Sequence, residues 1–186
     1  MDIRPAQVSD LPRLTEIDGT IDSKSYLFVD RTGEGMTMTF RLEERPLRAR
    51  LIDRNALDDD RRFAIKQVIT GIEEGAALVA EHEEELVALA VTQIQPATNT
   101  LELLDLRVDY DFRRQGIGTA MVFQLIATAR ERNLRAVTAR TLTNNLPANQ
   151  FLAKSGFELT GLDTHFASNH DLVKEAVTLF WYAALD

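Results

Sequence analysis

Two arginines and two glycines in the middle of the chain have the spacing of an anion-binding turn. Arg113, Gly116 and Gly118 occur as Arg-x-x-Gly-x-Gly, after one apolar run and before a second run with helical spacing. The N–H groups of a helix's first turn have no partner within the helix, and the helix dipole adds partial positive charge there. Glycine lacks the Cβ that would hold a phosphate away from these groups. With the added charge of Arg114, the segment predicts a site for a diphosphate.

The spacing excludes two other phosphate-binding motifs. A Walker loop requires Lys and then Ser or Thr after its second glycine, whereas Gly118 is followed by Thr119 and Ala120. A dinucleotide fingerprint requires a third glycine where this chain has Met121. For the motif taken by itself, a glycine-rich helix start with solvated arginines is the structural alternative.

Missing residue types narrow the chemistry further. The chain has no cysteine, which excludes disulfides, thiolate metal sites and a cysteine nucleophile. The histidines, His82, His165 and His170, lack the spacing of metal ligands, so we expect no metal site. Serine or threonine without a nearby base is a poor nucleophile, so a covalent enzyme intermediate is not expected.

The apolar periodicity predicts a mixed α/β fold in a single domain spanning residues 1–186. Alternating or continuous apolar runs indicate strands, and spacing of three to four residues indicates helices. The predicted strands are 3–4, 36–42, 76–80, 86–94, 101–108, 136–142, 157–162 and 175–184. One helix is predicted to begin at Ser9, and three more are predicted at about 60–74, 116–133 and 147–155. The helix at 60–74 should bury Phe63 and Ile72, and a loop is predicted before it at 45–60. This order indicates a mixed sheet with helices on both faces.

Composition and charge are typical of an acidic globular protein. The 21 basic and 29 acidic side chains give a formal net charge of −8, and 45% of residues are hydrophobic. The acidity argues against non-specific nucleic-acid binding and suits a cationic partner. The first residues have no apolar signal-peptide segment, and no apolar run is long enough to cross a bilayer. We therefore expect a cytoplasmic protein with neither nucleic acid nor membrane as partner.

Two segments together resemble the signatures of the GCN5-related N-acetyltransferases (GNAT). Residues 103–118 resemble the family's motif A, which binds the pyrophosphate of acetyl-CoA, and 145–157 resemble its second signature, a helix led by Asn and Ala and ending in Gly-Phe. The resemblance implies a mixed central sheet that splays between its fourth and fifth strands, at 101–108 and 136–142. It also implies acetyl-CoA as co-substrate and direct attack of an amine on the thioester.

More narrowly, the chain resembles the streptothricin (nourseothricin) acetyltransferases. Those enzymes acetylate an amine on the β-lysine part of a cationic antibiotic, which implies a small-molecule amine as substrate. The matching segments are 17–20, 33–40, 112–118, 161–164 and 176–182.

The resemblance also assigns cofactor contacts. Backbone groups of Leu106, Arg107 and Val108 would bind the pantetheine arm and polarise the thioester carbonyl. Asn145 would hold the cofactor from another side, and Leu152 occupies a further cofactor-contacting position. The diphosphate would lie on the turn formed by Arg113, Arg114, Gln115, Gly116, Ile117, Gly118 and Thr119.

A base is valuable because deprotonating an amine of pKa about 10.4 at pH 7 costs about 4.6 kcal/mol. The streptothricin enzymes carry Glu-Asp where this chain has Leu104 and Asp105. Glu102 lies six residues before Val108, where histone-type relatives place their catalytic Glu. It is the first candidate base and Asp105 the second, with a strand-edge and a salt-bridged structural role as alternatives. Strand alternation would place these two carboxylates on opposite faces.

The general acid and the acceptor site carry further expectations. Leu152 replaces the Tyr that many members use to protonate the leaving thiolate, so water or Tyr182 would take that role.

Cationic amines favour desolvated carboxylates, although each acidic residue has a solvated surface role as its alternative. The candidate acceptor carboxylates are Asp18, Asp22, Glu44 and Asp163.

Other interpretations remain open at this point. One is acetylation of a protein lysine or N-terminal amine. Another is a non-catalytic acyl-CoA-binding sensor, motivated by Leu104 and Leu152 at positions where relatives are polar. The aromatic final strand also allows a homodimer through its edge.

Overall fold

The computed structural model describes residues 1–186 and contains two compact units. The first unit comprises 1–20, 54–139 and 182–186, and the second comprises 21–53 and 140–181. Strands β7 (Ala136–Leu142) and β9 (Thr178–Ala184) contribute residues to both units. The interpretation of 1–186 as one domain stays a prediction. No helix is both long and apolar enough to cross a bilayer.

The first unit is a sheet in the order β1-β4-β5-β6-β7 with helices around it. Neighbouring strands are antiparallel except β6 and β7, which are parallel, so the predicted mixed sheet is confirmed. Besides β7, its elements are β1 (Asp2–Pro5), η1 (Val8–Glu16), α1 (Asp59–Ile69), β4 (Gly75–His82), β5 (Glu85–Gln95), β6 (Thr100–Val108), η2 (Tyr110–Phe112) and α2 (Ile117–Glu131).

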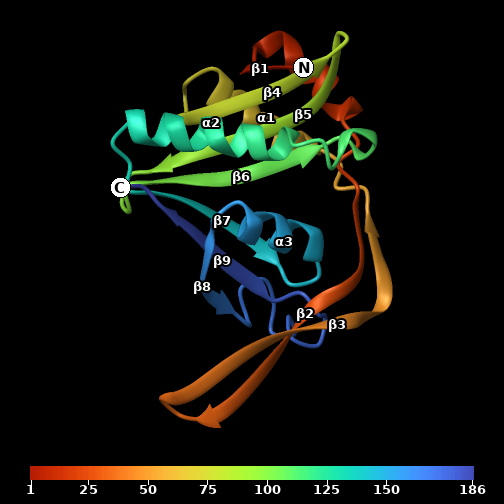
Figure 1. The fold of residues 1–186 in the computed structure, drawn as a ribbon, viewed down its shortest axis with the longest axis vertical. Helices are drawn as coiled ribbons and strands as arrows, with labels where there is room; N and C mark the ends of the chain where they lie inside the picture. The colour runs from red at the N-terminus through yellow and green to blue at the C-terminus, as the bar shows by residue number, and fades with distance from the viewer. The chain divides into compact units, whose positions relative to one another are not determined.

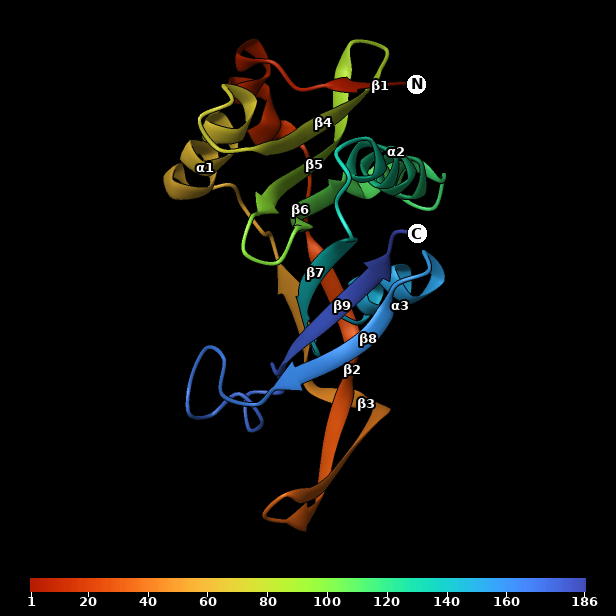
Figure 2. The same cartoon turned by 90° about the vertical axis from the view of Figure 1, so that its left-hand side faces the viewer.

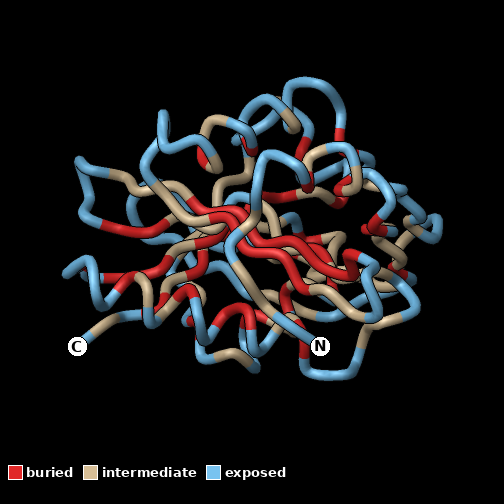
Figure 3. The backbone as a smooth tube through the Cα atoms, turned by 90° about the horizontal axis from the view of Figure 1, so that it is seen from above, coloured by how far each residue is buried: buried red, intermediate tan, exposed pale blue.

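Helices cover both faces of this sheet, as predicted. α2 runs along β4, β5 and β6 (Figure 1), and α1 lies on the opposite face (Figure 2). Val79, Leu89 and Val91 pack with η1 and α1, whereas α2 buries Met121 and Leu125. Because β4 and β5 are covered on both sides, their sequences are nearly continuous runs of apolar residues. Figure 3 shows such buried stretches as long red runs bordered by exposed turns.

The second unit contains a long hairpin and the strand order β7-β9-β8. Its elements are β2 (Ile21–Glu34), β3 (Thr37–Asp53), α3 (Leu146–Lys154) and β8 (Glu158–Asp163). The loop predicted at 45–60 is wrong, because β3 continues to Asp53. Pro46 lies within β3 next to a register shift, and such an irregularity tolerates a proline that cannot donate to the ladder.

Two helix predictions also need correction. α1 ends at Ile69, and Gly71 follows with a left-handed φ of 76°, so Ile72 lies outside the helix and is 71% exposed. Phe63 is likewise 64% exposed. The first helix is a 3-10 helix capped at Gln7 rather than at Ser9, and it contains Pro12, whose missing N–H disfavours a regular α-helix.

Candidate functional site

The pairing between β6 and β7 stops before β6 ends. Paired residues run from Thr100 to Leu103 on β6, whereas β6 stays paired with β5 as far as Val108. The N–H of Asp109 donates to β5, so alternation directs the backbone groups of Val108 and Leu106 to the other edge. The N–H groups on this edge are therefore available to a ligand's amide groups, and within the predicted trio Leu106 and Val108 are the residues that face it.

Side-chain contacts hold the turn between β6 and α2 in shape. One oxygen of Asp109 accepts from the N–H of Asp111 at 3.1 Å, and the other accepts from the N–H of Asp18 at 2.8 Å. Arg113 donates from Nε to the carbonyl of Val108 at 3.0 Å. Arg113 therefore positions the turn, and its guanidinium is anchored on the end of β6.

The N-terminus of α2 has the features of an anion site. Gly116 is its N-cap, with a left-handed φ of 82°, and no side chain caps the helix. The N–H of Ala120 bonds to the carbonyl of Gly116 at 3.0 Å, so the N–H groups of 117–119 precede that first internal bond. Arg114, which also has a left-handed φ of 64°, and Gln115 are exposed beside them. Convergent N–H groups and the positive end of the dipole favour a phosphate here.

Asp105 is engaged with a buried cation. It accepts two hydrogen bonds from Arg107, at 2.9 and 2.6 Å, and Arg107 is buried. Arg107 also donates to the carbonyl of Asn55 at 2.7 Å and packs so closely on Gly19 that a Cβ there would lie 3.0 Å from Nη1. This geometry favours the salt-bridged structural role for Asp105.

We expect Asp105→Ala to lower the free energy of unfolding by about 3 kcal/mol, because the charge of Arg107 would stay buried without its partner. In a chain of this size that corresponds to a fall in Tm of about 6 to 12 °C, measured by calorimetry. The double variant Asp105→Leu, Arg107→Met removes both charges and should recover most of the loss. An unchanged Tm for Asp105→Ala would contradict the structural role.

A bulge in β6 changes the relation between the two candidate bases. Asp105 is opposite Val91 on β5, and Glu102 is opposite Gln93, with the register shifting between them. Because Val91 and Gln93 are two residues apart, both carboxylates lie on one face of the sheet, and the expected opposite placement is wrong. Glu102 accepts a hydrogen bond from the amide of Gln95 at 2.7 Å, which orients its carboxylate.

The other predicted residues have local partners. The hydroxyl of Tyr182 accepts a hydrogen bond from Arg135 at 2.9 Å in the first unit. In the second unit, the side chain of Asn145 caps α3 by accepting from the N–H of Ala148 at 3.3 Å. Leu152, on the same helix, is buried. The cofactor contacts expected for Asn145 and Leu152 stay predictions.

Three of the four candidate acceptor carboxylates already accept hydrogen bonds from nearby groups of the chain. Asp18 accepts hydrogen bonds from the hydroxyl and the N–H of Thr20, and these bonds hold the pKa of Asp18 below its usual value. Asp22 forms a two-fold ion pair with Arg50, at 2.7 and 2.5 Å, and Asp163 accepts a backbone N–H at 2.8 Å. Glu44 is exposed on β3. No group of three acidic or histidine side chains lies close enough together to hold a metal ion.

The second unit contains a cavity that no sequence motif predicted. It measures about 240 Å³ and is lined by Tyr26, Phe28, Thr143 and Glu175, among others. None of the four acceptor candidates lines it. These residues come from three separate parts of the chain, and no motif connects them.

A protein-family model and two curated relatives match the chain. The model described as the Acetyltransferase (GNAT) family matches residues 39–157. Streptothricin acetyltransferase A of Bacillus subtilis (strain 168) is 33% identical over 78 residues, which cover 42% of this chain and 44% of that protein. The streptothricin acetyltransferase of Escherichia coli is 27% identical over 111 residues, which cover 59% and 63%. The chain thus spans less than two thirds of the length of either relative.

Solved structures share the fold over the whole chain. A Bacillus anthracis str. Ames protein, described as a candidate streptothricin acetyltransferase in complex with acetyl coenzyme A, is 20% identical with a TM-score of 0.79, over 100% of this chain and 97% of that one. Nourseothricin acetyltransferase is 22% identical with a TM-score of 0.78, over 100% and 98%. The ribosomal-protein-S18-alanine N-acetyltransferase of Escherichia coli is 17% identical with a TM-score of 0.64, over 100% and 94%.

Proposed function

Because the chain belongs to the acetyltransferase (GNAT) family, we propose that it is an acetyl-CoA-dependent N-acetyltransferase for a primary amine of a small cationic molecule. The observation that carries this proposal is the uncapped N-terminus of α2 after the end of β6. The streptothricin acetyltransferase relatives support a streptothricin-like antibiotic as acceptor. The acetyl coenzyme A bound by the Bacillus anthracis protein supports the co-substrate.

The residues of the turn fit a diphosphate. Apart from Gly116 and its two chain neighbours, no residue has an atom within 4 Å of the position that a Cβ on Gly116 would take, so a ligand can approach the helix end closely. The N–H groups of 117–119 would bind the diphosphate. The edge N–H groups of Leu106 and Val108 would bind the pantetheine amides and polarise the thioester carbonyl.

The reaction follows from these contacts and one base. Acetyl-CoA, as substrate, would supply a thioester whose acetyl group passes directly to the amine nitrogen as the carbon–sulfur bond breaks. Glu102 would accept the proton that the amine loses, directly or through water. A thiol of pKa about 8.5 lies only about 1.5 units above neutral pH, worth about 2 kcal/mol. Water or Tyr182 can therefore protonate the leaving thiolate in place of the Tyr that Leu152 replaces.

A second candidate is acetylation of a protein's N-terminal amine. It is supported by the fold likeness to the Escherichia coli ribosomal-protein-S18-alanine N-acetyltransferase, which extends over the whole of this chain. The acidity of the chain suits cationic acceptors of either size.

A thiol-release assay with an amine panel tests the proposal. We expect turnover with streptothricin and with short diamines, at kcat/KM values at least 100-fold above those for peptides with an N-terminal alanine. Turnover with the peptides alone would establish the second candidate. CoA binding without turnover on any amine would contradict both and indicate a binding module.

A further inference from the structure

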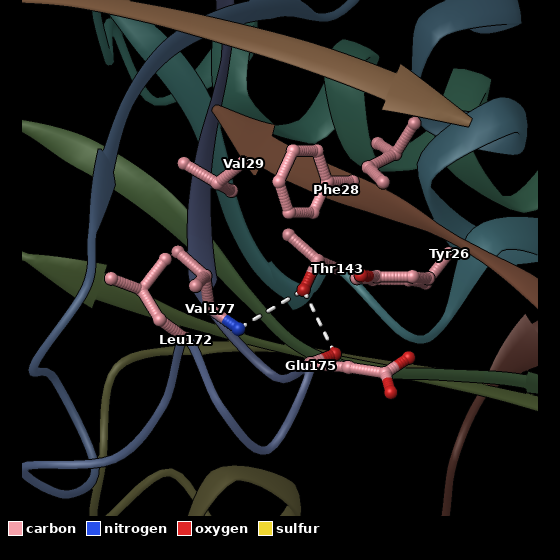
Figure 4. A pocket seen from close by; sticks show the side chains of 8 residues that line it. Tyr26, Phe28, Val29, Thr143, Leu172, Glu175 and Val177 are labelled. Atoms are coloured by element: carbon pink, nitrogen blue, oxygen red, sulfur yellow. Dashed lines mark hydrogen bonds between the residues drawn. The ribbon is translucent and has the colours of Figure 1, made fainter. Parts of the chain in front are cut away.

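The cavity of the second unit brings two aromatic rings and one carboxylate together. Tyr26 and Phe28 extend from β2, and Glu175 comes from the segment before β9 (Figure 4). The two rings meet edge to face with centroids 6.4 Å apart. At about 30 Å³ for each water molecule, the volume of about 240 Å³ equals that of about eight waters. It therefore has room for one small organic group.

A buried hydrogen-bond network fixes the position of Glu175. The hydroxyl of Thr143, which is 1% exposed, donates to the carbonyl of Glu175 at 3.1 Å and accepts from the N–H of Val177 at 3.0 Å. The carbonyl of Thr143 accepts in turn from the N–H of Leu27 on β2 at 3.1 Å. Glu175 has a left-handed φ of 58°, which is unfavourable for a residue with a Cβ. The surrounding bonds therefore hold it in a conformation that it would not adopt alone.

The carboxylate of Glu175 is only half satisfied. The residue is 7% exposed, and its Oε1 accepts from Nε of Arg48, but its Oε2 is buried and has no hydrogen-bond partner. A buried carboxylate oxygen without a donor is costly. Oε2 is closed to solvent in the conformation that Arg48 holds, so a ligand gains affinity by replacing Arg48 and donating to the carboxylate once it has turned toward the cavity. Burial, and then the charge of Glu175, raise the pKa of Tyr26, with Arg45 and Arg48 opposing.

The cations around the cavity do not supply that donor. The side chain of Arg48 is 71% exposed and also donates to the carbonyl of Val173. Arg45 lies over the face of Phe28, 3.7 Å from its centroid, and pairs with Glu43 at 3.0 Å. Phe28 thus already accepts a cation on one face, as aromatic rings do. Tyr26, whose ring meets that of Phe28 edge to face, lines the cavity together with Glu175.

We propose that this cavity binds a primary alkylammonium group that displaces the exposed Arg48 from the carboxylate of Glu175, with Tyr26 and Phe28 packing on its methylenes. The identification of this ligand as a second amine of the acceptor rests on the proposed function, and the binding itself does not. Glu175 is then a specificity-determining residue, because a neutral chain of the same length leaves the carboxylate oxygen without a charged donor.

Calorimetry with 1,5-diaminopentane and no CoA tests the site directly. We expect the wild-type chain to bind this diamine at least tenfold more tightly than 1-pentanol, and Glu175→Gln to lose that difference. Glu158→Gln removes an equal charge from an exposed position on β8 and should bind as the wild type does. Equal diamine affinity in Glu175→Gln and the wild type, or no heat with either, would overturn the proposal.

Two further readouts separate this site from a structural ion pair and from the proposed function. Arg48→Gln removes the partner of Glu175 and should keep or strengthen diamine binding, whereas equal weakening by both substitutions would indicate a structural pair only. With diamine as acceptor, Glu175→Gln should raise KM at least tenfold and leave the Kd of CoA unchanged. Diamine binding without acetyl transfer would overturn the proposed function alone, and acetyl transfer with an unchanged KM would overturn the identification of the ligand as a second amine of the acceptor.

Discussion

Gly118→Asp is expected to raise the Kd of CoA at least 100-fold without loss of folded protein. Its carboxylate would lie in the first turn of α2, where it would repel the diphosphate and compete for the same N–H groups. An acidic residue in that turn stabilises a helix by about 0.3 to 1 kcal/mol, and replacing a helical glycine adds a similar gain. Calorimetry with CoA and a Tm measurement check the two halves of this prediction.

Gly118→Asn is the matched control, because it has the shape of aspartate without the charge. We expect its loss of CoA affinity to be at least tenfold smaller than that of the aspartate variant. A Kd of the aspartate variant within threefold of the wild type would mean that the diphosphate does not bind at α2. The proposed function would then lose the observation that carries it.

The second large effect is expected at Glu102, on the amine side of the reaction. Glu102→Gln should lower kcat at pH 7 by about 100-fold to 10,000-fold, the usual contribution of a general base. Its CoA affinity and Tm should stay unchanged, since the amide keeps the shape of the side chain. The deficit should shrink as the pH approaches the pKa of the acceptor, about 10.4, because the amine then loses its proton in solution.

The pH profile and the neighbouring carboxylate make this result decisive. A pH-independent deficit would indicate that Glu102 positions another group and does not take the proton. Asp105→Ala provides the comparison, because it should lower Tm while kcat per folded molecule changes little. The reverse outcome would assign the base to Asp105. In that case Glu102→Gln would keep full activity, and Asp105→Ala would lose rate without a fall in Tm.

Local signals were sufficient for much of the fold. The strands of the first unit and the helix α2 were predicted within a few residues, because their apolar spacing and bounding turn residues act within each segment. The same holds for the turn at 113–119, where Gly116 has a left-handed φ of 82°, a conformation that favours glycine. The long β3 was missed because a proline normally ends a strand, and only the register shift opposite it makes the strand possible.

The chemistry of single side chains was decided by the tertiary structure. A bulge places Glu102 and Asp105 on one face, and Arg107 occupies the second of these carboxylates. Tyr26, Thr143 and Glu175 line one cavity although more than a hundred residues separate the first from the others. The family, the strands of the first unit and the turn before α2 could be predicted from the sequence, since their signals depend on neighbours along the chain. Which carboxylates are paired, and which one keeps an unsatisfied oxygen, depends on contacts between distant segments, and only folding brings those together.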